Sequence, residues 1–240
     1  MMEELLKNIS EAEKVLIGIG TVFEEKYQSL YNEEFKKMEA EDPLYAGYEK
    51  LQYMEKYMSQ DCLEAYKKLF SLVKDKDYFL VTVCKDDVVY KAGFDEEKIV
   101  APCGTFRFLQ CIDNCKKELL PVTEKMVMEK QEITCPHCHK KACFNQIGEW
   151  AYNEDGYLPQ WQVYNKWLQS TINKKLCIIE LGVGMQYPTV IRWPFEKMFM
   201  FNNKAVMYRV HETLNQFPAE IEKEGYSVAQ NPIRFLLQNE

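Results

Sequence analysis

The stretch KVLIGIG at residues 14–20 decides the fold class, because it is a short apolar run that ends in glycines. Such a run is typical of a parallel strand that is buried on both faces of a sheet. Runs of the same character recur at residues 78–83, 98–101, 175–181 and 204–209. Helical patterns separate them: residues 2–12, 22–74 (two or three helices), 86–93, 157–172 and the tail from Asn231. The alternation predicts an α/β, Rossmann-like parallel sheet with helices on both faces.

Three groups of residues directly follow the expected strands: Gly18-Ile19-Gly20, Cys84-Lys85-Asp86 and Gly182-Val183-Gly184. In parallel α/β sheets the ligand crevice lies outside the carboxyl ends of the strands, so we expect these groups to line it. The glycines would let backbone amides approach a phosphate. However, the third glycine of the dinucleotide fingerprint is replaced by Phe23. A turn that needs glycine only for steric reasons is an equally good explanation.

The composition restricts the classes of function. The chain has 240 residues, and 30 Lys and Arg against 37 Asp and Glu give a formal charge of −7, which argues against a nucleic-acid binder. The length suits one domain with a small inserted lobe, or two modest domains. No apolar run approaches the roughly 20 residues of a membrane span. The opening MMEELLKN is acidic where a signal peptide is basic. We therefore expect a cytoplasmic protein without nucleic-acid or membrane partners.

Two close pairs of cysteines predict a metal site. Cys111-x3-Cys115 and Cys135-x2-Cys138 have the spacing of a structural zinc ribbon. Four thiolates close such a site and leave no position open for water, so the Zn²⁺ should be structural. A set of unrelated buried cysteines is the alternative.

Other residues near these pairs could replace a cysteine as ligand, namely His137, His139 and Cys143. We prefer the all-cysteine site, because the tight turn places His137 between two ligands and pointing away. The zinc-binding insertion is expected over residues 106–144. It would interrupt a Rossmann-like domain formed by residues 1–105 and 145–240, with the helical segment 22–74 in its first part.

Together these features resemble the sirtuins, which join a Rossmann-type NAD domain to a small zinc ribbon. The sirtuin motifs Gly-Ala-Gly, Thr-Gln-Asn-Ile-Asp followed by Ala-Gly, His-Gly-Ser and Gly-Thr-Ser are similar to four segments here: Gly18-Ile19-Gly20, Thr82 to Asp86 with Ala92-Gly93, Cys103-Gly104-Thr105 and Gly182-Val183-Gly184. A divergent bacterial branch is more similar still, at Lys91 to Asp95, Glu180 to Gly184 and Pro188 to Glu196. That branch is related to bacterial sirtuins that act as protein ADP-ribosyltransferases. The resemblance covers about residues 14–238.

The resemblance implies NAD and Zn²⁺ as cofactors, NAD or ADP-ribose as ligand, and a protein as a candidate substrate. His211 occupies a position where relatives place an asparagine near the adenosine ribose. Asp86 and Cys103 are the implied catalytic positions. The implied cofactor-binding residues are Gly18, Ile19, Gly20, Cys84, Asp86, Gly182, Val183, Gly184 and His211.

The departures from the sirtuin pattern bear on the reaction. Deacetylation needs a histidine to accept a proton from a ribose hydroxyl, and Cys103 stands at that position. A free thiol has a pKa of about 8.5, so it is a poor substitute. Cleavage of NAD with transfer of ADP-ribose needs less, because a carboxylate such as Asp86 could stabilise the oxocarbenium-like ribose. We therefore expect NAD cleavage with release of nicotinamide rather than deacetylation.

Several simpler interpretations stand beside this one. Cys103 could be a small core residue, and Asp86 could serve only as the cap of a following helix. The Glu- and Lys-rich stretches are expected to be solvated helix faces. The alternative function is a catalytically inactive sirtuin-fold protein that binds a nucleotide or a protein partner. An NAD pocket filled by Phe23, Tyr27 or Lys85 would favour that alternative.

Overall fold

The structure is a computed structural model that describes residues 1–30, 32–57, 59–221 and 225–238, with the backbone alone for 25–29. Its main sheet has six parallel strands in the order β3-β2-β1-β7-β8-β9. Their bounds are β1 Lys14–Ile19, β2 Asp77–Thr82, β3 Ile99–Val100, β7 Leu176–Leu181, β8 Ala205–Val210 and β9 Tyr226–Val228. This is the doubly wound order of Rossmann folds, whose direction of winding reverses between β1 and β7. The predicted parallel α/β class is confirmed.

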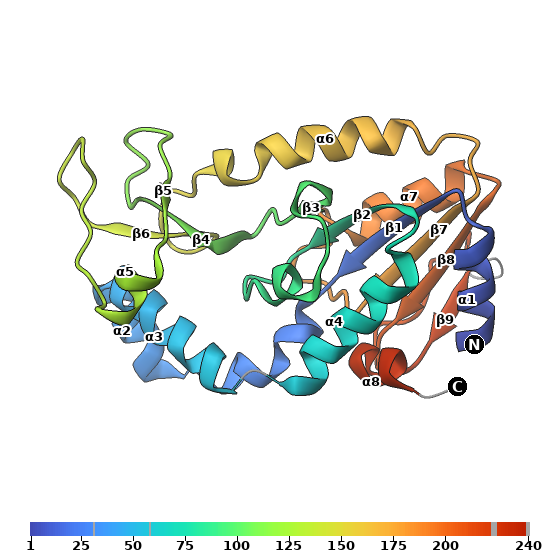
Figure 1. Ribbon diagram of the computed structural model, residues 1–240, viewed down its shortest axis with the longest axis horizontal. Coiled ribbons are helices and arrows are strands. Elements are labelled where there is room, and N and C mark those ends of the chain that lie inside the picture. Colours follow the sequence, from blue (N-terminus) through green and yellow to red (C-terminus); the bar gives the residue numbers. More distant parts are fainter. Residues whose placement is uncertain (31, 58, 222–224, 239–240) are drawn as a thin grey trace.

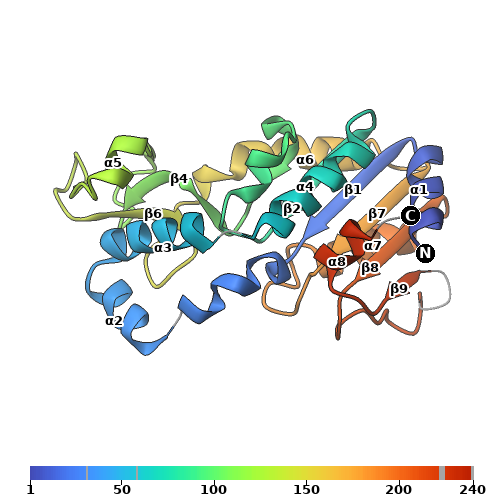
Figure 2. The same cartoon turned by 60° about the horizontal axis from the view of Figure 1, so that its bottom comes forward.

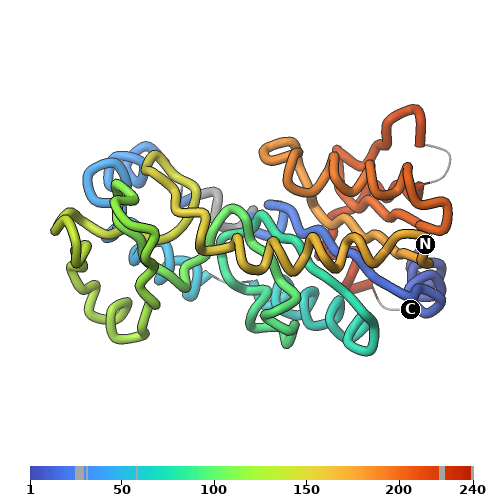
Figure 3. Tube along the Cα trace, turned by 90° about the horizontal axis from the view of Figure 1, so that it is seen from above, coloured from blue at the N-terminus to red at the C-terminus, as the bar shows by residue number. Residues whose placement is uncertain are grey.

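Helices cover both faces of the main sheet (Figure 1). Successive side chains of a strand point to opposite faces. Ile17 therefore packs in the core beneath α1, α4 and α8, whereas Leu16 packs in the core beneath α6 and α7. Figure 3 shows α6 and α7 running side by side on one face. The bounds are α1 Met2–Glu11, α4 Gln60–Val73, α6 Leu158–Gln169, α7 Arg192–Phe201 and α8 Pro232–Leu237. Among the described residues, no helix combines the length and the hydropathy that crossing a membrane requires.

A second, three-stranded sheet forms a small lobe beside the main sheet. Its strands, in the order β5-β4-β6, are β5 Leu120–Pro121, β4 Gly104–Cys111 and β6 Ala142–Gln146, all antiparallel. The helices at this end are α2 Glu33–Glu41, α3 Pro43–Tyr57 and α5 Glu124–Met128. Helix α3 packs on β6, with the Tyr48 ring 5.4 Å from the Phe144 ring (Figure 2). Segment 22–74 is therefore divided: α2 and α3 lie with the small lobe, and α4 covers the main sheet.

Some local structure differs from the sequence-based expectation. The helix expected over 86–93 is only a short 3₁₀ turn, η2 Val88–Ala92. It starts late because Asp87 has a left-handed backbone, with φ 56°, and it ends at Gly93 with φ 97°. Three more 3₁₀ turns are η1 Thr21–Leu30, η3 Glu96–Lys98 and η4 Glu154–Gly156. Helix α7 and strand β9 were not predicted.

Candidate functional site

The two glycine turns meet at the point where the sheet changes its winding direction. The Gly20 amide donates to the Leu181 carbonyl at 2.8 Å, and the Val22 amide donates to the Gly182 carbonyl at 3.4 Å. A Cβ atom on Gly20 would lie 2.0 Å from the Gly182 oxygen. The turns after β1 and β7 are therefore in backbone contact at the crevice where such sheets bind ligands.

The contacts explain three of these glycines by packing within the protein, and one of them is Gly182, which has a φ of 65° and where a Cβ would lie 2.7 Å from the Val22 side chain. A Cβ on Gly18 would lie 2.5 Å from Ile191 and 2.7 Å from Phe195, so Gly18 lets α7 approach the sheet. The backbone of Gly182 leaves no room for a side chain at position 20. At Gly184, in contrast, a Cβ would meet no described atom within 4 Å. The steric explanation therefore applies to Gly18, Gly20 and Gly182, whereas Gly184 faces open space.

The third predicted group joins the same contact. The Cys84 thiol donates to the Gly20 carbonyl at 3.2 Å, so the turn after β2 is bonded to the turn after β1. Burial, together with the nearby carboxylates of Glu24 and Asp86, raises the pKa of the Cys84 thiol well above its usual range. The thiol is therefore a neutral donor that holds the turn. Ile19 and Val183 are fully buried, so only their backbone groups could serve a ligand.

Asp86 lies beside this junction and is 6% exposed. Its Oδ1 accepts a hydrogen bond from the Val88 amide at 3.2 Å, which supports a capping role at the start of η2. Its Oδ2 is buried and has no hydrogen-bond partner among the described residues. Burial and the carboxylate of Glu24 raise the pKa of Asp86 well above its usual range. Asp86 is thus a cap whose second carboxyl oxygen has no hydrogen-bond partner in the described part of the chain.

Three charged residues around Asp86 escaped the sequence analysis: Glu24, Lys50 and Asp87. We call these three and Asp86 the acidic cluster. The Glu24 carboxylate accepts from the Lys85 amide at 2.6 Å. Asp87 accepts from the Phe106 amide at 2.8 Å, and burial raises the pKa of Asp87 to about 7.

Lys50, on helix α3, is the only positively charged residue of the acidic cluster. It is 5% exposed, and its Nζ lies 5.3 Å from the centre of the Phe106 ring. Burial lowers the pKa of Lys50, whereas Glu24, Glu39, Asp86 and Asp87 act in the opposite direction. The expectation that Lys-rich stretches form solvated helix faces is wrong for Lys50. The pair Asp86-Asp87 was a sequence signal for a second carboxylate, but nothing in the sequence marked Lys50.

Cys103 is fully buried in the core beneath α6 and α7. Burial raises the pKa of its thiol to about 12, so the group is neutral at physiological pH. Its carbonyl accepts from the Ile147 amide at 3.0 Å, which links the segment before β4 to the segment after β6. These observations match the interpretation of Cys103 as a small core residue.

His211 follows β8 and organises the loop behind it. Its Nδ1 accepts from the amides of Thr213 and Leu214, each at 3.1 Å. Burial and the positive charge of Arg192 lower the pKa of His211. An acceptor Nδ1 carries no proton, so the ring is neutral in this arrangement.

The four predicted zinc ligands come together at the tip of the small lobe. One sulfur each from Cys111, Cys115, Cys135 and Cys138 lies within 4.8 Å of the others. The Cys111–Cys138 and Cys115–Cys135 sulfur distances are both 3.5 Å. Zn–S bonds of about 2.3 Å require tetrahedral edges of about 3.8 Å, so the arrangement fits Zn²⁺.

The remaining candidate ligands have other surroundings. The His137 Nε2 forms a hydrogen bond with Glu118, and the His137 amide donates to the Cys135 sulfur at 3.5 Å. Cys143 is fully buried in the small lobe. An amide that donates to a thiolate is a usual outer contact of such a metal ligand.

Solved structures with the same architecture identify the fold. A Sir2 homologue in complex with NAD has a TM-score of 0.61 and 13% identity, over 98% of this chain and 90% of that chain. A mutant Sir2 homologue in complex with ADP-ribose has a TM-score of 0.60 and 15% identity, over 98% and 94%. Sir2Tm bound to a propionylated peptide has a TM-score of 0.61 and 15% identity, over 98% and 95%.

The chain has the sirtuin fold. No protein-family model matches it. Two sequence relatives carry names of ADP-ribose chemistry. A "Protein ADP-ribosyltransferase" of Staphylococcus aureus is 24% identical, over 95% of this chain and 84% of that protein. A "Probable bifunctional ADP-ribose hydrolase/ADP-ribosyltransferase" of Fusarium oxysporum is 27% identical over 55% of this chain and only 25% of that protein. Within the sirtuin fold, the glycine turns follow β1 and β7, and Asp86 and Asp87 of the acidic cluster follow β2, at the carboxyl edge of the main sheet.

Proposed function

We propose that this protein cleaves NAD, releases nicotinamide and transfers ADP-ribose to an acceptor. The observation that carries the proposal is the Asp86 carboxyl, which lies buried just after the carboxyl end of β2 with Oδ2 free of hydrogen bonds among the described residues. The sirtuin fold and the names of the two sequence relatives support it.

The acidic cluster suits this chemistry. The bond between the ribose C1′ and the nicotinamide nitrogen breaks, and its electron pair neutralises the ring. Positive charge then develops on the ribose, where a preorganised carboxylate stabilises it. The acceptor attacks C1′ and gives up a proton. Burial and the carboxylate of Glu24 raise the pKa of Asp86, and the positive charge of Lys50 offsets them only in part. A cationic substrate supplies that charge and favours the carboxylate form.

The same geometry argues against deacetylation. A general base works best when its pKa lies near the operating pH. Burial raises the pKa of Cys103 to about 12, far above that range. His211, a candidate replacement, uses its Nδ1 to accept two backbone amides. We therefore propose that the wild-type chain removes acetyl groups from lysine peptides at no appreciable rate.

The NAD substrate would lie along the junction of the glycine turns, with its adenosine toward Gly182-Val183-Gly184 and His211. Gly184 is the position that best tests this placement, because a side chain there would enter open space. Gly184→Val should weaken ADP-ribose binding without unfolding the chain. Gly20→Val would instead collide with the Gly182 backbone and should destabilise the fold whether or not a ligand binds.

The four cysteines would hold a structural Zn²⁺ with no part in the reaction. Metal analysis should find one zinc per chain. Cys111→Ser should lower the melting temperature, because binding free energy at a structural site is folding free energy. Cys177→Ser, at a buried cysteine outside this cluster, separates general loss of packing from loss of metal. A metal-free protein of unchanged stability would contradict this proposal.

One observation favours a second candidate, a protein that binds a nucleotide without turning it over. The three side chains at the family's reactive positions are closed off, with exposures of 6% for Asp86, 4% for Cys84 and 0% for Cys103. Phe23 also packs into the core, 4.8 Å from the Tyr66 ring. The side chain of Tyr27 lies outside the described residues.

Nicotinamide release, measured by chromatography, separates these functions. Asp86→Asn should lower release about 100-fold or more, the usual size of a lost electrostatic contact in the transition state. Asparagine keeps the size and the acceptor that caps Val88. Cys103→Ala serves as the matched control and should change release little. Robust wild-type deacetylation that is lost in Cys103→Ala would overturn the proposal. ADP-ribose binding without any NAD turnover would support the second candidate.

A further inference from the structure

A second group of buried charges lies on the other side of the glycine turns. It consists of Glu180 on β7, Arg209 on β8, and Arg192 and Glu196 on α7, and we call it the arginine network. Glu180 and Arg209 are direct neighbours in the sheet register. Arg209 binds both carboxylate oxygens of Glu180, at 2.7 and 2.9 Å, and lies 2.8 Å from the Glu196 carboxylate. Glu180 and Arg209 lie next to the last residues of their strands, and Arg192 and Glu196 lie in the first half of α7.

Arg192 connects the two loops that follow β7 and β8. Its Nη1 donates to the Val183 carbonyl at 3.1 Å, in the turn after β7. Its Nη2 donates to the carbonyls of Leu214 and Gln216, at 2.9 and 3.2 Å, in the loop after β8. One planar guanidinium thus spans both loops. A lysine ammonium has no such fork and could not reproduce the geometry.

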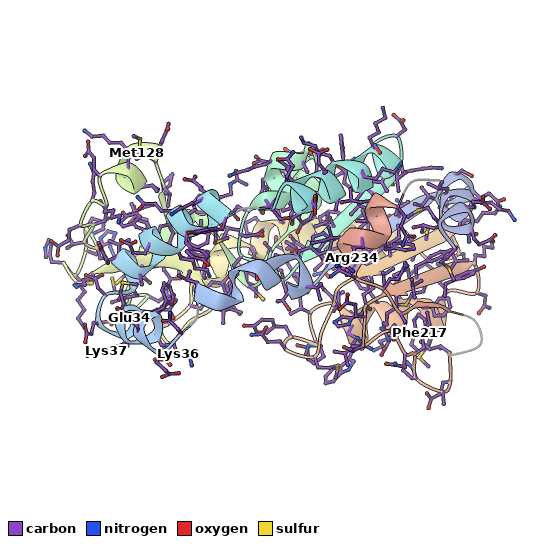
Figure 4. The ribbon with its side chains drawn as sticks, turned by 90° about the horizontal axis from the view of Figure 1, so that it is seen from below. Glu34, Lys36, Lys37, Met128, Phe217 and Arg234 are labelled. Carbon is purple, nitrogen blue, oxygen red and sulfur yellow. The ribbon has the colours of Figure 1, made fainter. Side chains whose placement is uncertain are left out.

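Other contacts hold the loop after β8 against the arginine network. Arg209 donates to the Gln216 carbonyl at 2.8 Å, and its guanidinium lies 4.7 Å from the centre of the Phe217 ring. Figure 4 labels Phe217 in the part of the molecule that holds the main sheet. His211 accepts the amides of Thr213 and Leu214. The loop is therefore fixed at both ends by side chains that are themselves at least partly buried.

We propose that Arg192 is a positioning residue for the adenosine half of the nucleotide. It sets the distance and orientation between the turn at Gly182-Val183-Gly184 and the loop at residues 211–217, between which the adenosine would lie. This inference rests on the proposed function, because it assumes a nucleotide in the crevice. Arg192 acts through backbone carbonyls and uses its donors within the protein itself, so it makes no direct contribution to bond cleavage.

The test compares Arg192→Lys with wild type by calorimetry with ADP-ribose and by steady-state NAD cleavage. Loss of one or two hydrogen bonds to a charged donor should weaken ADP-ribose binding about 10- to 100-fold. The KM for NAD should rise by a similar factor, whereas kcat should stay within about threefold of wild type. Inhibition by added nicotinamide should be unchanged, because nicotinamide would occupy the other half of the crevice. Lys197→Met, at an exposed residue of the same helix, is the matched control.

The outcomes distinguish this inference from the proposed function. If the wild-type chain binds neither ADP-ribose nor NAD, the proposed function fails and the inference falls with it. If wild type binds and Arg192→Lys binds equally well, only the inference is overturned. A fall in kcat at constant KM would also overturn it, because that split places Arg192 in the chemical step. Arg192→Met tests the same contacts with no charge, and melting curves of both variants show which is folded. Arg192→Lys keeps a cation beside Glu180 and Glu196, so its binding and kinetics decide the outcome.

Discussion

The acidic cluster and the arginine network are two groups of largely buried charge on either side of the glycine turns, and they are built differently. The arginine network pairs two arginines with two glutamates, at distances down to 2.7 Å. The acidic cluster sets three carboxyls, Glu24, Asp86 and Asp87, around Lys50, and one carboxylate oxygen has no hydrogen-bond partner among the described residues. Paired arginines and glutamates can hold the neighbouring backbone in place. Buried carboxyls that outnumber their cations are suited to bind a cationic group.

This difference has a physical basis in the free energy of burying charge. A buried ion pair is tolerated when its partners satisfy one another's hydrogen bonds. An unbalanced group lowers its free energy by shifting its pKa and taking up protons. The raised pKa values of Asp86 and Asp87 fit that behaviour. Burial also raises the pKa of Glu180 in the arginine network, but there Arg209 and Arg192 act in the opposite direction. Strongly shifted carboxyls in a crevice are more typical of functional sites than of structural ones.

The largest effect is expected from breaking the arginine network. Arg209→Met should lower the free energy of unfolding by about 3–5 kcal/mol, because the buried Glu180 and the partly buried Glu196 would then lose their main partner. Urea denaturation at neutral pH measures the change. Lys204→Met, at an exposed position just before β8, is the control for charge removal alone. A loss below about 1 kcal/mol would show that the network is not the balanced structural unit that its contacts indicate.

A smaller effect is expected from the acidic cluster. Lys50→Met should lower the free energy of unfolding by about 1–3 kcal/mol at pH 7. The loss is smaller than for Arg209→Met because the three carboxyls can become protonated once the cation is removed. The loss should shrink as the pH falls toward about 5, since protonated carboxyls no longer need a counter-charge. Lys56→Met, at an exposed residue of the same helix, should show no such pH dependence. A loss equal to that of Arg209→Met at every pH would erase the distinction between the two groups.

The strands and the cysteine cluster could be predicted from the sequence more fully than the contacts between buried charged residues. The strands could be found because burial on both faces makes runs such as residues 14–19 apolar throughout, and the cysteine spacing indicated which sulfurs meet. Strand β9 was missed because three residues carry too little pattern. Helix α7 was missed because it is apolar on several sides.

The contacts between buried charged residues could not be predicted from the sequence for another reason. Glu180 and Arg209 each stand in an otherwise apolar strand, which is a sign of a buried pair, but only the sheet register makes them partners. Lys50 lies in a helix rich in charge, where burial has no sequence signal. Glu24 follows the first glycine turn by four residues, and its role depends on the path of η1 toward Lys85. Long-range contacts thus supplied what composition and spacing could not.

The smallest effect is expected from Asp87, whose ionisation makes the free energy of unfolding depend on pH. Its pKa is raised to about 7, whereas an aspartate in an unfolded chain has a pKa of about 3.9. Between these values the native state keeps a proton that the unfolded state has released. Stability from this group is therefore full below about pH 4 and is lost as the pH rises through about 7.

Asp87→Asn removes this titration while keeping an acceptor for the Phe106 amide and a residue type that tolerates a φ of 56°. The variant should gain stability relative to wild type as the pH rises from about 4 to 7, by up to about 1.4 kcal/mol per pH unit. Urea denaturation at several pH values measures the difference, with the exposed Asp95→Asn as the matched control. Parallel stability curves for wild type and Asp87→Asn would mean that Asp87 is ionised in the native state. The neighbouring cations Arg107 and Lys91 would then offset the burial of Asp87 fully, and the acidic cluster would be as balanced as the arginine network.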